Sequence, residues 1–287
     1  MINPHIAFGE EGDILHFAHA NGYPPRAYKP FLKHFASDYR VVASSLRPLW
    51  PDADPNEVAD WSVLSADLLR VFEQLGTKIL PGHNKIIGMG HSVGATSTLM
   101  TALQRPELFQ ALVLVEPVIL LPWLSMLWKV VTKLGLQYRF HPLIKGALKR
   151  RYRFPSRAAM YKNYRSKPIF RRISDGGLRE YVNALAREEP NGEVILAYPP
   201  AWEARIYATA GLCEPYIWSL TSNLKLPVLL IQGAETDTFG NRIAQRLLER
   251  LSFAELNIMP DIGHLAPLEA PERVFQVIKK YLRTVDV

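Results

Sequence analysis

The residues best suited to chemistry form the pentapeptide Gly90-His91-Ser92-Val93-Gly94, which matches the pattern G-x-S-x-G. An apolar run over 85–89 precedes the pentapeptide and a helical pattern follows it, as a nucleophile elbow requires. Its two glycines allow a tight turn that lifts the serine hydroxyl above the sheet edge, and the following helix N-terminus favours developing negative charge. This context predicts a nucleophilic role for Ser92. An ordinary glycine-rich turn between strand and helix is the structural alternative.

A serine hydroxyl is a poor nucleophile at neutral pH, so a histidine must accept its proton and a carboxylate must orient that histidine. Asp237 follows the apolar run 228–232, and His264 follows the run 254–258. Both residues therefore lie in loops at the carboxyl ends of predicted strands, where the catalytic groups of open α/β sheets gather. Each residue alone is more often an ordinary loop residue. Together with the elbow they predict a triad of Ser92, Asp237 and His264.

Glu116 is an alternative acid, because it closes another apolar run, 111–115. We favour Asp237, and otherwise expect Glu116 to line the pocket or support the site. Asp261 is close in sequence to His264 and is not preferred.

The elements that must position these residues are visible in the hydrophobic pattern. Short runs rich in Val, Ile and Leu recur between helix-like stretches, which is typical of parallel strands covered on both faces. The predicted strands are 14–18, 39–44, 85–89, 111–115, 228–232 and 254–258. Leu64, Leu68 and Phe72 repeat at the spacing of a helix with one buried face, and further helices are predicted over 93–104, 241–251 and 271–283. This alternation indicates α/β architecture.

The alternation stops in the middle of the chain, where no convincing strand appears. We therefore predict two parts of one core, 1–118 and 223–287, separated by a helical cap over 119–222. Residues 119–220 contain 17 Lys or Arg and 7 Asp or Glu, so the rest of this +7 chain is net −3. Between Lys129 and Arg179, 15 basic residues stand against one acidic residue, Asp175. A solvated helical face is the commonest reason for such a run, and an anionic membrane surface or an anionic substrate are the alternatives. Nucleic acid is not expected, because no nucleic-acid-binding motif accompanies the charge.

The cysteine count and the apolar segments also indicate in which cellular compartment to expect the protein. Cys213 is the single cysteine, so no intramolecular disulfide can form, and residues 1–12 lack the basic and apolar segments of a signal peptide. The longest apolar run, 118–128, is interrupted by Pro122 and is shorter than the roughly 20 residues that a membrane-spanning helix needs. We expect a cytoplasmic protein, with peripheral attachment to a membrane surface left open.

These motifs resemble the α/β-hydrolase superfamily, in the branch that includes epoxide hydrolases, haloalkane dehalogenases and cofactor-free esterases. The resemblance covers 1–118 and 223–287 and includes the elbow, Asp237, His19-Ala20-Asn21-Gly22, and Gly263-His264 followed by Pro267 and Glu269. It implies an α/β-hydrolase fold, with a mostly parallel central sheet, helices on both faces and a helical cap inserted after the sixth core strand. Some family members place the triad acid at the strand end where Glu116 stands.

The resemblance also implies an oxyanion hole formed by the backbone N–H groups of Asn21 and Val93. Ala20 stands where the family usually has glycine. We expect His19 and His91 to be structural. Dehalogenases and epoxide hydrolases carry aspartate at the nucleophile position, so Ser92 argues against both activities.

The family and the cap together favour a serine esterase that uses neither metal nor cofactor. Its expected substrate is a lipophilic small-molecule ester, because residues 120–131 are apolar on nearly every face and would suit a lid over an apolar acyl pocket. Thioesters and lactones fit the same machinery. The alternatives are a carbon–carbon hydrolase or lyase on the same fold, and a small-molecule receptor that retains the triad.

Overall fold

The computed structural model describes residues 5–79 and 85–285, with the backbone alone for 75–79. A seven-stranded sheet runs through these residues in the order β1-β3-β2-β4-β5-β9-β10. The strands are β1 (His5–Phe8), β2 (Ile14–Ala18), β3 (Arg40–Ser44), β4 (Ile86–His91), β5 (Phe109–Val115), β9 (Val228–Gly233) and β10 (Ala254–Met259). β1 pairs antiparallel with β3, and every other pair in this sheet is parallel.

All six predicted strands are present, with ends within two residues of the expected positions. Their sequences are continuous apolar runs because β2, β4 and β9 are buried along their whole length. The sequence analysis missed β1, an edge strand whose side chains are all partly or fully exposed. It lacks the run of Val, Ile and Leu that identified the others.

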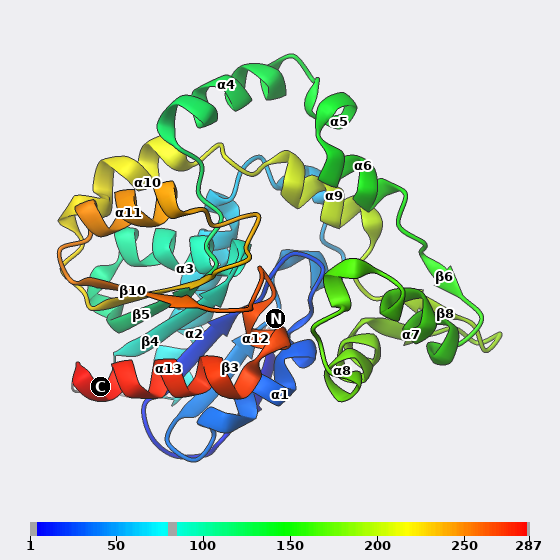
Figure 1. Cartoon of the computed structure of the whole chain (residues 1–287), viewed down its shortest axis with the longest axis horizontal. Helices are drawn as coiled ribbons and strands as arrows, with labels where there is room; N and C mark the ends of the chain where they lie inside the picture. The colour runs from blue at the N-terminus through cyan, green and yellow to red at the C-terminus, as the bar shows by residue number, and fades with distance from the viewer. Residues whose placement is uncertain (1–4, 80–84, 286–287) are drawn as a thin grey trace.

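Helices cover both faces of the sheet (Figure 1). His16 and Phe17 are neighbours in β2, so their side chains point to opposite faces. His16 contacts Phe72 of α2 (Ser62–Ile79), whereas Phe17 contacts Phe31 of α1 (Lys29–Leu32). The helix α3 (Val93–Gln104) packs against α2, and α13 (Pro271–Thr284) packs against α1. The remaining core helices are α11 (Asn241–Arg250) and α12 (Ala266–Glu269), with short 3₁₀ turns η1 (Pro25–Tyr28), η2 (Lys33–Phe35), η3 (Arg47–Leu49), η4 (Pro55–Glu57), η5 (Pro106–Leu108) and η7 (Thr221–Asn223).

The segment between β5 and β9 forms the predicted cap, mostly helical. Its helices are α4 (Pro122–Lys133), α5 (Gln137–Phe140), α6 (Pro142–Leu148), α7 (Arg157–Arg165), η6 (Pro168–Phe170), α8 (Asp175–Leu185), α9 (Pro200–Ala208) and α10 (Glu214–Leu220). In one detail the expectation was wrong. The cap contains a small antiparallel sheet of β6 (Arg153–Phe154), β8 (Val194–Leu196) and β7 (Ala186–Glu188), whose strands of two or three residues are too short to show a pattern. The cap follows β5, as the family resemblance implied for a helical insertion at this place in the sheet.

Polar contacts hold the cap on the loops at the carboxyl ends of the strands. The indole of Trp61 donates to the carbonyl of Ile206 at 3.1 Å, and Nε of Arg205 donates to the carbonyl of Val58 at 2.8 Å. The side-chain amide of Asn21 donates to the carbonyl of Glu203 in α9 at 3.0 Å. The cap therefore contacts the same loop that was predicted to supply an oxyanion donor.

Candidate active site

Ser92 occupies the sharp turn between β4 and α3. Its φ angle of 56° is rare for a residue with a side chain, and its N–H donates to the carbonyl of Val115 at 3.0 Å. The two glycines of the elbow are needed for close approach. A Cβ atom on Gly90 would lie 2.5 Å from the backbone of Gly94, and one on Gly94 would lie 2.2 Å from the carbonyl oxygen of Ala18. The turn therefore presses α3 against the loop that follows β2.

His264 lies between Ser92 and a buried carboxylate. Its Nε2 is 3.1 Å from Oγ of Ser92, and its Nδ1 is 3.0 Å from Oε2 of Glu116. Because a carboxylate accepts, Nδ1 carries the proton and Nε2 is free to accept from the serine hydroxyl. Glu116 is fully buried, whereas the side chain of His264 is 18% exposed. Ser92, His264 and Glu116 thus form a continuous chain of hydrogen-bonding contacts, which is the geometry that a serine nucleophile with a base and an orienting acid would require.

Glu116 is held in place by the neighbouring strand. It follows β5 with a φ angle of 51°, and its N–H donates to the carbonyl of Ile231 in β9 at 2.9 Å. The N–H of Gly233 donates to Oε1 at 2.6 Å, and the hydroxyl of Thr236 donates to Oε2. Each of these contacts of the carboxylate is with a hydrogen-bond donor, so its position is fixed from several sides.

The preference for Asp237 as the residue that orients His264 is corrected by this geometry. Asp237 is exposed at the surface and accepts a hydrogen bond from the hydroxyl of its neighbour Thr238 at 2.9 Å. Thr236 faces Glu116 instead, and its Oγ1 accepts from the N–H groups of Thr238 and Phe239. This tight turn directs one residue inward and the next outward. The loop after β9 therefore contributes to the site through its threonine.

The loop carrying His264 is fastened from two sides. The carboxylate of Glu269 accepts from the N–H groups of Gly263 at 2.9 Å and Leu265 at 3.3 Å, the residues on either side of the histidine. The carbonyl of His264 accepts from Nε2 of His91 at 2.8 Å. His91 is fully buried, and burial together with the charge of His264 holds its pKa well below the ordinary value.

Because Nε2 of His91 donates, its Nδ1 must accept, and the donor is the hydroxyl of Tyr28 at 2.7 Å. The same hydroxyl accepts from the N–H of Ala20 at 3.3 Å. A buried chain of hydrogen bonds thus joins the loop after β2 to the histidine loop. His19 is also structural: its Nε2 accepts from the N–H of Leu46 at 2.9 Å, and burial lowers its pKa to about 4.

The expected oxyanion donors lie on the two segments that the elbow brings together. Val93 begins α3, where a backbone N–H has no carbonyl partner within the helix. Asn21 lies in the loop after β2, and its side-chain carbonyl accepts from Tyr198 of the cap at 2.9 Å. Ala20 has none of the positive φ angles found among the described residues, so it replaces glycine without backbone strain.

A buried arginine of the cap stands beside this loop. Arg150 pairs with Glu203 and donates to the hydroxyls of Tyr164 at 2.8 Å and Tyr181 at 2.6 Å. Tyr181 in turn donates to the carbonyl of Gly22 at 3.4 Å. These contacts connect the cap to the loop that carries Asn21.

Sequence reasoning missed Thr236 and Tyr28 as parts of the site. Nothing in the sequence around either residue distinguishes it from an ordinary loop or turn residue. Glu269 was noted only as part of the family pattern, and its position six residues after Gly263 is the one local signal that could have identified its role.

Comparisons with known proteins identify the family of this chain. The profile of the Alpha/beta hydrolase family matches residues 17–277. A strigolactone esterase of Arabidopsis thaliana is 32% identical over 108 residues, which are 36% of this chain and 38% of that protein. A probable esterase of Oryza sativa subsp. japonica is 32% identical over 115 residues, 39% of this chain and 40% of that protein. The matches to these curated relatives therefore span about two fifths of their length.

Among solved structures, the thioesterase domain from the curacin biosynthetic pathway superposes with a TM-score of 0.76 at 17% identity, covering 96% of this chain and 94% of that one. At this identity the likeness concerns the fold. The family match extends over most of the chain and includes Ser92, Glu116 and His264. The chain therefore belongs to the Alpha/beta hydrolase family.

Proposed function

We propose that this protein is a serine hydrolase that cleaves carboxylic esters through an acyl-enzyme intermediate. The observation that carries the proposal is the chain of contacts Ser92 Oγ to His264 Nε2 at 3.1 Å and His264 Nδ1 to Glu116 Oε2 at 3.0 Å. This arrangement meets the geometric requirement for a serine nucleophile activated by a histidine.

In the first half of the reaction, Oγ of Ser92 attacks the ester carbonyl carbon while Nε2 of His264 takes its proton. The carbonyl oxygen becomes an oxyanion, which the N–H groups of Asn21 and Val93 stabilise. Glu116 stabilises the imidazolium and keeps its proton on Nδ1. Collapse of the intermediate breaks the bond to the alcohol, and His264 gives its proton to the departing oxygen.

In the second half, a water molecule attacks the acyl carbon and His264 accepts the water proton. The carboxylic acid leaves as the proton returns to Oγ of Ser92, which restores the enzyme. These steps use neither a metal nor a cofactor.

A lipophilic acyl part is our proposal for the substrate class. Its support is the character of α4, where half-buried residues such as Leu124 and Trp128 are apolar. A cap of this kind fits an apolar substrate better than a charged one.

The test combines active-site labelling with an ester panel. A fluorophosphonate is expected to add once, at Ser92, and p-nitrophenyl esters of increasing chain length are expected to turn over. Ser92→Ala should abolish labelling and lower turnover by at least about 10⁴-fold. Ser252→Ala, which removes an exposed hydroxyl on the core, is the matched control and should leave both unchanged.

The other readings of the triad predict different results. Labelling at Ser92 without turnover of any ester would contradict the esterase proposal and favour a carbon–carbon hydrolase or lyase. A single slow turnover would favour a receptor that retains the triad.

A further inference from the structure

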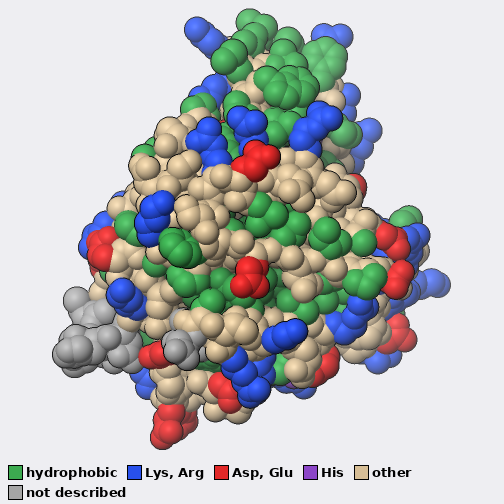
Figure 2. Space-filling model, turned by 60° about the vertical axis from the view of Figure 1, so that its left-hand side comes forward, with side chains coloured by type: hydrophobic (Ala, Val, Ile, Leu, Met, Phe, Trp, Pro, Cys, Tyr) green, Lys and Arg blue, Asp and Glu red, His purple; other side chains and the backbone are tan. Residues whose placement is uncertain are grey.

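The helix α4 carries an apolar stripe on its outer face. Trp123 and Val130 each lie three or four residues from Leu127 and Met126, so the four share one face, and each is more than half exposed, with Met126 at 70%. The stripe continues into Leu134 and Phe140, which are 65% and 64% exposed. Figure 2 shows hydrophobic side chains gathered on this projecting end of the molecule.

The opposite face of α4 is anchored, so the outer face points away from the protein. The hydroxyl of Ser125, which is buried, donates to the carbonyl of Gly211 at 2.7 Å. Just before the helix, the indole of Trp218 donates to the carbonyl of Leu120 at 2.8 Å, and the N–H of Leu120 donates to Glu214 at 3.1 Å. The stripe therefore lies on a fixed helix and covers no part of the described core.

Exposed cations flank the stripe. They are Lys129, Lys133, Arg139, Lys145 and Lys149. None of the five has a carboxylate within ion-pair distance among residues 5–79 and 85–285, and no acidic residue occurs between Glu116 and Asp175. No salt bridge within the described residues offsets these charges, and Lys129 has only a longer-range interaction with the buried Glu214.

The second part of the basic run, residues 150–179, contains several ion pairs. Arg153 pairs with Glu193 at 2.8 Å, Arg157 pairs with Glu188 at 3.1 Å, and other arginines of this part pair with Asp175, Glu235 and Glu269. These ion pairs explain that part as an ordinary charged protein surface. Six of the ten cations in 150–179 therefore have an ion pair, whereas none of the five beside the apolar stripe has one among the described residues.

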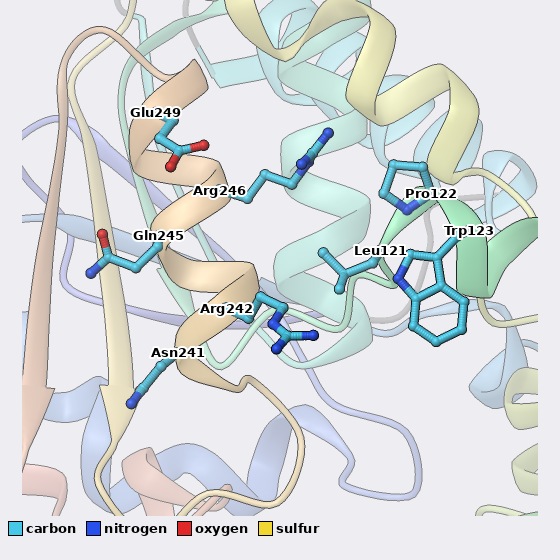
Figure 3. Close-up of a pocket in the computed structure, with 8 residues that line it drawn as sticks. All are labelled: Leu121, Pro122, Trp123, Asn241, Arg242, Gln245, Arg246 and Glu249. Atoms are coloured by element: carbon cyan, nitrogen blue, oxygen red, sulfur yellow. The ribbon is translucent and has the colours of Figure 1, made fainter.

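A groove of about 780 Å³ adjoins the start of the stripe (Figure 3). Pro122 and Trp123 line it from α4 and Leu121 from just before that helix, and α11 contributes Arg242, Arg246 and the acidic Glu249. Figure 3 shows both arginines extending from α11 toward the start of α4. Neither guanidinium has an ion-pair partner in the part of the chain that the structure describes. The groove excludes Ser92, Glu116 and His264, so it is separate from the candidate active site.

From these features we infer that the outer face of α4 and α5, with the groove beside it, docks on an anionic lipid bilayer. The apolar stripe enters the boundary between headgroups and acyl chains, while the flanking lysines pair with lipid phosphates. Arg242 and Arg246 bind headgroup phosphates at the mouth of the groove.

Charge complementarity favours lipid over a second copy of the chain. In a twofold dimer the same patch would face itself, so unpaired lysines such as Lys129 and Lys133 would oppose like charges. An anionic bilayer offers negative headgroups for the flanking cations and an apolar interior for the stripe, so it matches both parts of this surface. No helix among the described residues has the length and apolarity to cross a membrane, so the contact would be with the bilayer surface.

Co-sedimentation of the full chain with vesicles tests this inference. Vesicles of phosphatidylcholine with phosphatidylglycerol should bind the protein, vesicles of phosphatidylcholine alone should bind it weakly, and salt should reduce binding to the anionic ones. Each basic residue near an anionic surface contributes about fivefold in affinity. Lys129→Glu/Lys133→Glu should therefore weaken binding to anionic vesicles at least about 25-fold.

Two further variants separate the apolar contribution from the electrostatic one. Trp123→Ser/Met126→Ser/Leu127→Ser keeps the net charge and should weaken binding to both kinds of vesicle. Phe253→Ser/Ile258→Ser removes exposed apolar side chains of the core and is its matched control. Lys29→Glu/Lys280→Glu makes the same change of net charge on exposed residues of α1 and α13 and is the control for the lysines. Circular dichroism and thermal melting check that every variant folds.

Equal, negligible sedimentation with both vesicle types overturns the inference. So does loss of binding in the Lys29/Lys280 control as large as in Lys129/Lys133, because net charge alone would then explain it. A dimer in analytical ultracentrifugation that the triple serine variant abolishes, without lipid binding, would assign the stripe to a second copy and also overturn it.

Discussion

Oε2 of Glu116 lies 3.0 Å from Nδ1 of His264, although 148 residues separate the two in the chain. The contact arises because Glu116 ends β5, while His264 follows β10, with β9 between them in the sheet. The carboxylate also accepts from Gly233 and Thr236 at the end of β9, so all three strand ends meet at this one side chain.

Substitutions of the two carboxylates considered as the triad acid should affect kcat very differently. Glu116→Gln should lower kcat by about 10⁴-fold, because the amide no longer holds the histidine proton on Nδ1, as an aspartate does in a well-studied triad. Asp237→Asn should leave kcat within about threefold, because Asp237 is exposed and contacts Thr238. Steady-state kinetics of the two variants decides the matter, with thermal melting as a check on folding. A larger loss in Asp237→Asn would contradict the triad of the structure.

Tyr28 connects the loop before Asn21 to the histidine loop through His91. Tyr28→Phe leaves the N–H of Ala20 and Nδ1 of His91 buried without this partner, so the free energy of unfolding should fall by about 2 kcal/mol. We also expect kcat to fall about tenfold with little change in KM, because both loops position groups of the transition state.

The matched control for Tyr28 is Tyr281→Phe. The hydroxyl of Tyr281 is buried with no hydrogen-bond partner among the described residues, so removing it should leave stability equal or raise it. Chemical denaturation of both variants provides the comparison, and equal stability losses would argue against a specific role for the Tyr28 hydroxyl.

Glu214, the first residue of α10 in the cap, is expected to make the stability of the protein depend on pH. Burial raises the pKa of this carboxyl to about 7, from 4.5, and its Oε2 has no partner among the described residues. Because the folded-state pKa is the higher one, protonation favours the folded protein, and this stabilisation is lost as pH rises through about 7. Glu214→Gln keeps the acceptor for the N–H of Leu120 and removes the buried charge.

The free energy of unfolding of Glu214→Gln, relative to the unsubstituted protein, should therefore be about 2 kcal/mol higher at pH 8 than at pH 5. Urea denaturation at the two pH values measures this difference. Glu249→Gln, at an exposed carboxyl of α11, is the control and should show no such dependence. A gain of equal size at both pH values would show that charge burial is not the cause.

Much of the site follows from local sequence. The elbow around Ser92 needs glycine at Gly90 and Gly94 because neighbouring backbone approaches both positions closely. This requirement can be recognised in five consecutive residues of the sequence. His264 follows an apolar strand in a loop, so its place at the carboxyl edge of the sheet follows from the strand pattern. The same patterns predicted six strands and the four longest core helices, because burial imposes regular hydrophobic spacing on them.

The tertiary structure decided what local pattern leaves open. Glu116 and Asp237 both follow strands, and those strands are neighbours about 4.8 Å apart, so either carboxylate starts close to His264. Which one contacts the histidine depends on the backbone turn at Glu116, with its positive φ, and on the turn at Thr236 that sends Asp237 outward. Likewise, the sequence shows that α4 carries apolar residues on nearly every face, whereas which of them stay in solvent depends on where Ser125 and Leu120 are anchored. Side-chain direction and exposure are set by contacts between distant segments, and only the folded chain contains those contacts.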